Sequence, residues 1–94
     1  MKMGVIQLHF RLPGCASLKE KRRRIKPLLS RLHKEFNVSV AELDFQDAWQ
    51  ETLIGCALIC NDTAIIQKTF EKIKTYSLTF FTEIELIAEK IEIL

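Results

Sequence analysis

The sequence has little of several residue types that mark special classes of protein. Its 94 residues include only three Cys, three Gly and two Pro, and they contain no Ser/Gly-rich segment and no internal repeat. With 48% hydrophobic residues, this composition excludes a disordered or low-complexity chain. The chain is also too short for two separate cores, so residues 1–94 are expected to form a single domain.

Long apolar runs are absent as well. The longest, Leu53 to Cys60, has eight residues, whereas a membrane-spanning helix needs roughly 20. The N-terminal residues enter directly into a strand-like pattern, without the apolar region of a secretory signal. We therefore expect no membrane partner and a cytoplasmic location.

The cysteines have neither the number nor the spacing of a disulfide framework or a metal site. Cys15, Cys56 and Cys60 are odd in number, and the last two lie four apart in a strand-like run. We interpret all three as small buried thiols. Phosphate-loop and dinucleotide motifs are missing too, and no catalytic constellation is found. The sequence thus predicts a protein without enzymatic activity, metal or small-molecule cofactor.

Charge is abundant but unevenly divided. Residues 1–37 carry a net charge of +8 and residues 38–94 a net charge of −6. The total of +2 therefore conceals a strongly uneven distribution of charge along the chain. Six of the ten residues from Ser17 to Lys26 are basic, namely Lys19, Lys21, Arg22, Arg23, Arg24 and Lys26. On a helix, Arg22 would pack its stem and the others would project outward. Such a cluster is typical of phosphate contact, so RNA or the ribosome is the expected partner, unless the face is merely solvated.

The first half of the chain has clear strand and helix signals. Residues Val5 to Leu12 alternate between apolar and polar, which predicts a strand with one buried face. Ser17 to Glu20 matches a capping box, in which the Glu20 side chain would return to the Ser17 amide. A helix should therefore begin at Leu18 and run to about Phe36, with a kink or a change of axis at Pro27.

The second half has the same kinds of signal. Strands are expected from Asn37 to about Phe45 and from Thr52 to Cys60, the latter apolar on both faces. Residues 61–63 provide a helix cap and a second helix follows. From Thr79 to Leu94 the pattern is that of a final strand, and its change of phase predicts a bulge between Ile87 and Lys90.

The order β-α-β-β-α-β predicts a ferredoxin-like α+β sandwich. Its four-stranded antiparallel sheet would have the order 4-1-3-2, with both helices on one face. Gln7, His9 and Arg11 would then lie on the open face, whereas either face of the third strand could be the covered one. Trp49, in the turn before that strand, either anchors a partner or covers one end of the core. Apolar surface on the open face or along the final strand predicts a homodimer.

Several motifs carry a resemblance to a known family. They are Cys15-x-Ser-Leu-Lys-Glu-Lys-Arg-Arg, Arg31-Leu, Phe36-Asn-Val-Ser-Val-Ala-Glu42, Gln46-Asp-x-Trp49-Gln and Asn61-Asp62. With these motifs the chain resembles the YlxP-like family, also called DUF503, over nearly its whole length. The resemblance implies a small bacterial ferredoxin-like protein, often encoded beside factors for translation initiation and ribosome maturation. It implies no catalytic residues.

Two functions follow as hypotheses. The first is a non-enzymatic accessory factor of translation or ribosome maturation that binds RNA through the basic helix. The second is a homodimeric protein-interaction module that uses the open sheet face and Trp49, without nucleic-acid binding.

Overall fold

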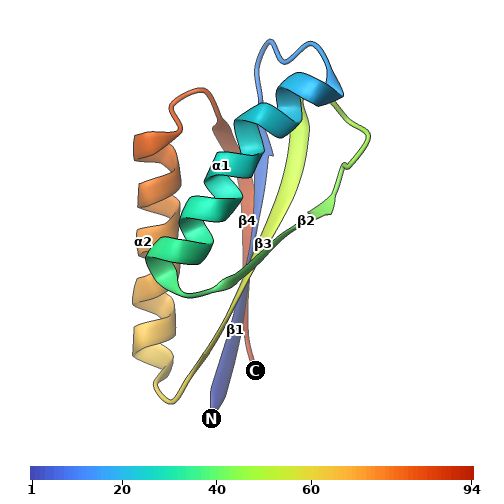
Figure 1. Cartoon of the computed structure of the whole chain (residues 1–94). Helices are drawn as coiled ribbons and strands as arrows, with labels where there is room; N and C mark the ends of the chain where they lie inside the picture. Colours follow the sequence, from blue (N-terminus) through green and yellow to red (C-terminus); the bar gives the residue numbers. More distant parts are fainter.

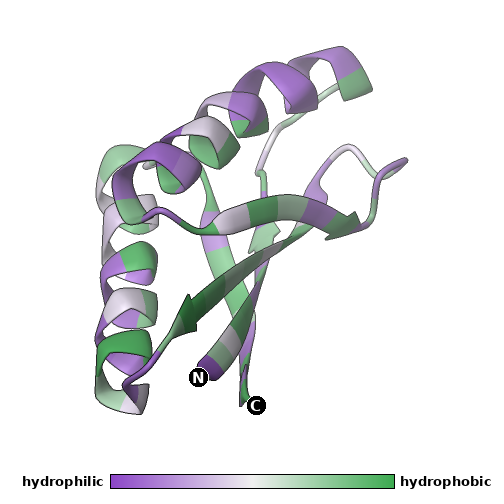
Figure 2. Cartoon of the chain, turned by 60° about the horizontal axis from the view of Figure 1, so that its bottom comes forward, coloured by the Kyte–Doolittle hydropathy of each residue, from purple (hydrophilic) through white to green (hydrophobic).

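The structure, a computed structural model, describes all of residues 1–94 as two helices on one side of a four-stranded sheet (Figures 1 and 2). In chain order the elements are β1 (Lys2–Arg11), α1 (Leu18–Phe36), β2 (Ser39–Asp44), β3 (Glu51–Cys60), α2 (Thr63–Phe80) and β4 (Glu85–Ile93). All strand pairs are antiparallel, in the order β2-β3-β1-β4. This confirms the predicted α+β fold and sheet order. Neither helix has an apolar stretch long enough to cross a lipid bilayer.

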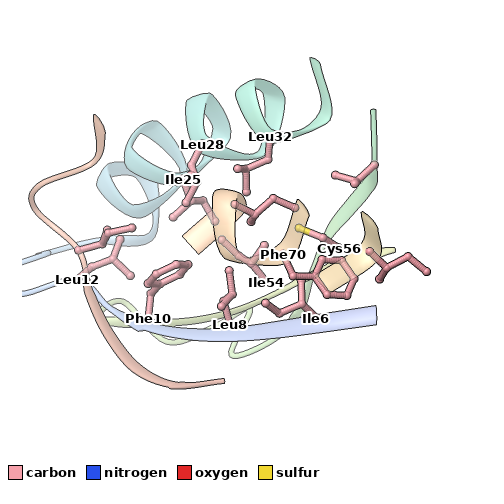
Figure 3. Close-up of a cluster of buried hydrophobic side chains, with 14 of the residues drawn as sticks. Ile6, Leu8, Phe10, Leu12, Ile25, Leu28, Leu32, Ile54, Cys56 and Phe70 are labelled. Carbon is pink, nitrogen blue, oxygen red and sulfur yellow. The ribbon is translucent and has the colours of Figure 1, made fainter. Parts of the chain in front are cut away.

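The core lies between the sheet and the two helices (Figure 3). The alternation of β1 places Ile6, Leu8 and Phe10 inside, as predicted, and each is at most 1% exposed. Burying a side chain of this size stabilises the fold by about 1.5–3 kcal/mol. The helices contribute Ile25, Leu28, Leu32, Ile66, Phe70 and Ile73.

The register of β3 shows which of its two apolar faces is covered. Ile54 and Cys56 are paired with buried residues of β1 and face the helices. Gly55 points to the open face, where a Cβ would come within 2.5 Å of the Leu43 side chain. Leu43 reaches this position because the register of β2 against β3 shifts there. The open face of β3 consists of Leu53, Gly55, Ala57 and Ile59.

The termini of α1 agree with the prediction, but one capping contact differs. The Ser17 side chain accepts from the Glu20 amide at 3.1 Å. The Glu20 carboxylate accepts from the Ala16 amide, 3.1 Å away, and not from that of Ser17. The chain approaches the cap in an extended conformation, which turns the Ala16 amide toward Glu20. The helix continues through Pro27 without a break and ends at Asn37 in the left-handed region (φ 50°).

The predicted start of the last strand was wrong. α2 includes Thr79 and ends at Phe80, and β4 begins only at Glu85. The β-forming run from Thr79 onward favours a strand locally. The helical hydrogen bonds nevertheless continue past Thr79, since the Phe81 amide donates to the Ser77 carbonyl at 3.0 Å.

A bulge in β4 confirms the predicted change of phase. Ala88 pairs with His9 and Leu86 with Phe10, which leaves Ile87 without a partner in β1. The extra residue lets apolar side chains on both sides of the bulge face the helices. Side chains of β4 beyond the bulge therefore keep contact with α2.

Candidate nucleic-acid interface

Four of the six predicted basic residues form one exposed face of α1. Lys19, Arg22, Arg23 and Lys26 are exposed and three or four residues apart, so they are neighbours on the helix surface. None of them takes part in an ion pair within the chain. We call these four residues the outer stripe.

Lys21 is not part of this face, and the prediction that it projects outward was wrong. Its side chain is 2% exposed, and its Nζ lies 2.9 Å from Oε2 of Glu42. The same Nζ donates to the Phe45 carbonyl at 2.5 Å. Lys21 falls in the row of Ile25 and Leu28, which faces the sheet. It therefore ties α1 to the end of β2.

The carboxylate that holds Lys21 is itself fixed by β3. Thr52 is buried, and its hydroxyl donates to Glu42 Oε2 at 2.6 Å. Phe45, whose carbonyl Lys21 holds, has a positive φ of 64°. A lysine with both a carboxylate and a carbonyl partner has its buried charge compensated. This network is structural and offers no site to a ligand.

Arg24 is also bound within the molecule, contrary to the prediction. Its side chain is only 17% exposed, between the carboxylates of Glu20 and Glu83, each 3.8 Å away. Its guanidinium donates to the carbonyls of Glu83 at 2.6 Å and Pro13 at 3.3 Å. Arg24 thus connects the first turn of α1 to the loops on either side and is not free for a phosphate.

A cleft of about 660 Å³ lies beside Arg24 at this end of the molecule. Its ionisable side chains are Glu20, Glu83, Glu85, Arg23 and Arg24. Hydrogen bonds from the Cys15 thiol and then the Ala16 amide hold the pKa of Glu20 below its usual value. Three carboxylates against two guanidinium groups disfavour a phosphate inside the cleft.

The basic surface extends beyond the predicted residues. Arg31 and Lys34 are exposed and have no ion pair. Lys34 is eight residues after Lys26, and the axial distance from Lys19 to Lys34 is about 22 Å at 1.5 Å per residue. Continuing the three- and four-residue spacing along the helix would have identified these residues from the sequence.

The predicted residues of the open sheet face are mostly engaged within the chain. The His9 ring stacks on Phe45 with 4.9 Å between centroids, and its Nε2 lies 3.3 Å from Glu51. Arg11 donates twice to Glu85, at 2.7 and 3.1 Å. Gln7 and His9 line a shallow hollow of about 270 Å³. Phe45 was not predicted as its neighbour, because stacking across the sheet depends on the conformation of a distant turn.

Trp49 lies outside that hollow and is 52% exposed. It is therefore not brought together with Gln7, His9 and Arg11. Trp49 belongs to the segment between β2 and β3, which Figure 1 draws as a loop at one end of the sheet. Half of its surface is available to a partner.

The thiols differ from one another in burial. Cys15 and Cys56 are buried, as interpreted from the sequence, whereas Cys60 is half-buried at the end of β3. Burial raises the pKa of the Cys56 thiol to about 12, so it stays protonated. No three His, Cys, Asp or Glu side chains gather in a way that could hold a metal ion.

Comparison with known proteins shows the family. The model of a family described as "Protein of unknown function (DUF503)" matches residues 3–91. The chain belongs to the DUF503 family. It is 38% identical over 69 residues to "Uncharacterized protein YlxP" of Bacillus subtilis (strain 168), a match that covers 73% of this chain and 74% of that protein. These matches confirm the resemblance found in the sequence motifs.

A solved structure shares the fold of this DUF503 member. The de novo designed protein Foldit4 matches 98% of the chain, and the match covers 96% of that protein, with a TM-score of 0.57. Because the identity is 18%, the likeness concerns the fold alone.

Proposed function

We propose that this protein is a non-enzymatic RNA-binding accessory factor of translation or ribosome maturation. Its outer stripe, Lys19, Arg22, Arg23 and Lys26, contacts phosphates of the RNA backbone. The observation that carries the proposal is that four neighbouring cations have no carboxylate partner, although the chain has twelve Asp and Glu residues. The translation setting is the one that the family resemblance implies.

The inner contacts of α1 support this function. Lys21 fixes the helix to the end of β2, and Arg24 fixes its first turn to the neighbouring loops. The backbone that carries the outer stripe is therefore rigid, and little backbone entropy is lost when phosphates bind. Contacts of this kind provide affinity and orientation without selecting a base sequence.

Salt titration of RNA binding tests the proposal. With four phosphate contacts at about −0.7 to −0.9 each, log affinity should fall with log salt at a slope of about −2.8 to −3.6. We would measure binding of structured ribosomal RNA by fluorescence anisotropy at several salt concentrations. Absence of binding at low salt would refute the proposal.

A matched pair of charge reversals shows which residues are involved. Arg22→Glu with Lys26→Glu should lower affinity at low salt at least about tenfold, because two contacts become repulsive. The control, Lys2→Glu with Lys68→Glu, makes the same change of net charge at exposed positions outside α1. Equal losses in both variants would mean that net charge, and not the outer stripe, determines binding.

A homodimer through the open sheet face is the second candidate. At one end of this face Ile59 is 67% exposed and paired with Met3. Leu43 adds further apolar surface over Gly55. Ile59→Lys should dissociate such a dimer in sedimentation equilibrium, whereas Ile65→Lys on the exposed side of α2 should leave it intact. A wild-type mass that stays monomeric at micromolar concentration would contradict this candidate.

A further inference from the structure

A groove runs between α1 and α2 beside the outer stripe. It consists of three adjoining hollows of about 320, 520 and 270 Å³. Phe80 lines the first and the second, and Tyr76 lines the second and the third. These two side chains of α2 therefore stand at the boundaries between neighbouring hollows. We call this surface the interhelix groove.

The α2 side of the groove exposes an aromatic ring. Phe80 is 60% exposed, whereas the other five Phe residues are buried or half-buried. Its ring centroid lies 4.7 Å from that of Tyr76, and Tyr76 in turn meets Phe36 edge-to-face at 5.5 Å. The inner rings hold Phe80 in place while its outer surface faces water. Such an arrangement has a large apolar area available for contact at little cost in side-chain entropy.

The α1 side of the groove is basic. Arg23 lines the hollow next to Phe80, and Arg31 and Lys34 line the hollow next to Tyr76. None of the three forms an ion pair. Of the acidic groups in the groove, Glu71 is 3.2 Å from Lys74 and Glu83 is 3.8 Å from Arg24. The third, Glu35, lies in the hollow of Arg31 and Lys34 and has no ion pair. The α1 wall thus has three unpaired cations against one unpaired carboxylate, and the other wall has an exposed ring.

We propose that the interhelix groove binds unpaired nucleotides of RNA, with a base stacked on Phe80 and the adjoining phosphates on Arg23 and Arg31. This inference rests on the proposed function and makes its substrate class more specific. Basic grooves with aromatic platforms bind single strands because every base has a ring face that can stack. The bases of an RNA duplex are stacked on one another and cannot reach a ring inside a hollow.

The test compares two RNA probes by fluorescence anisotropy on the full chain. One is an unstructured pyrimidine oligonucleotide, and the other is a blunt RNA duplex with the same number of phosphates. The wild type should bind the single strand more tightly. Phe80→Ala and Phe80→Leu should both lower its affinity by roughly 5- to 150-fold, the range for loss of one stacked base, and leave the duplex unchanged.

Two further variants separate the ring from general apolar surface. Phe80→Trp keeps a stacking platform and should retain the wild-type affinity. Leu78→Ala removes an exposed apolar side chain of α2 that lies outside the groove, and it should have no effect. Because Phe80 is largely exposed, we expect these variants to fold, and circular dichroism would verify it.

The outcomes distinguish this inference from the proposed function. Duplex binding that requires the outer stripe, without a single-strand preference or an effect of Phe80→Leu, would overturn the inference and leave the function standing. Absence of binding to either probe would overturn both. A wild-type dimer that Phe80→Leu dissociates would also overturn the inference, because a second copy would then cover the ring.

Discussion

The inner and outer rows of α1 contain the same residue types but have different roles. Lys21 and Arg24 are held by carboxylates and carbonyls of four other segments, whereas Lys19, Arg23 and Lys26 have no partner in the chain. The two rows alternate within one short stretch of sequence. The orientation of a residue on the helix, and not its charge, determines whether it stabilises the fold or remains available to a ligand.

Of the substitutions considered, removal of the buried Lys21 amine should lower the free energy of unfolding the most. Lys21→Met leaves the Glu42 carboxylate without its cation, and breaking a buried ion pair costs about 3–5 kcal/mol. Because the Glu42 side chain is 18% exposed, we expect a loss at the low end of this range, about 3 kcal/mol in the free energy of unfolding measured with urea. Adding Glu42→Gln should restore most of the loss, since the amide oxygen can still accept from Thr52. A loss below about 1 kcal/mol would mean that the pair is not buried in solution.

Substitution of Arg24 should lower the free energy of unfolding by less, because solvent reaches part of its side chain. Arg24→Met removes the hydrogen bonds to the Pro13 and Glu83 carbonyls and should cost about 1 kcal/mol in the same measurement. The neighbouring Arg23→Met is the matched control and should change stability by less than about 0.5 kcal/mol. Equal losses would contradict the division between the two rows.

The smallest effect on stability should come from the outer stripe itself. Lys19→Gln with Lys26→Gln removes two exposed charges that have no partner. The free energy of unfolding should stay within about 0.5 kcal/mol, while RNA affinity falls and the salt slope becomes less steep by about 1.4–1.8. A destabilised variant would show that these lysines have contacts that the structure lacks.

Local sequence patterns were sufficient to predict most of the fold. The alternation in β1 and the cap at Ser17 predicted where the first strand buries its side chains and where α1 begins. The covered face of β3 could not be predicted, because both faces are apolar and the choice depends on packing against the helices. The end of α2 was missed because the run at Thr79 consists of β-forming residues, yet the helical hydrogen bonds continue to the Phe81 amide.

The candidate site was predicted only in part, again for a physical reason. A basic run locates the helix that carries the charge, but the partners of Lys21 are more than twenty residues away in the chain. Arg24 likewise reaches Glu83, 59 residues distant. Phe80 could not be assigned to the surface from the sequence, because its exposure depends on where α2 ends relative to α1.

The two bulges in the sheet also determine how this protein can aggregate. β2 and β4 are the outermost strands, and each has one residue, Leu43 or Ile87, out of register. If a strand of another chain pairs with the edge strand on one side of the bulge, its hydrogen bonds are out of register on the other side. The bulges therefore disfavour growth of a filament by successive strand addition on both sides. The folded molecule can thus expose apolar side chains such as Ile59 while its edge strands remain poor templates for pairing with another chain.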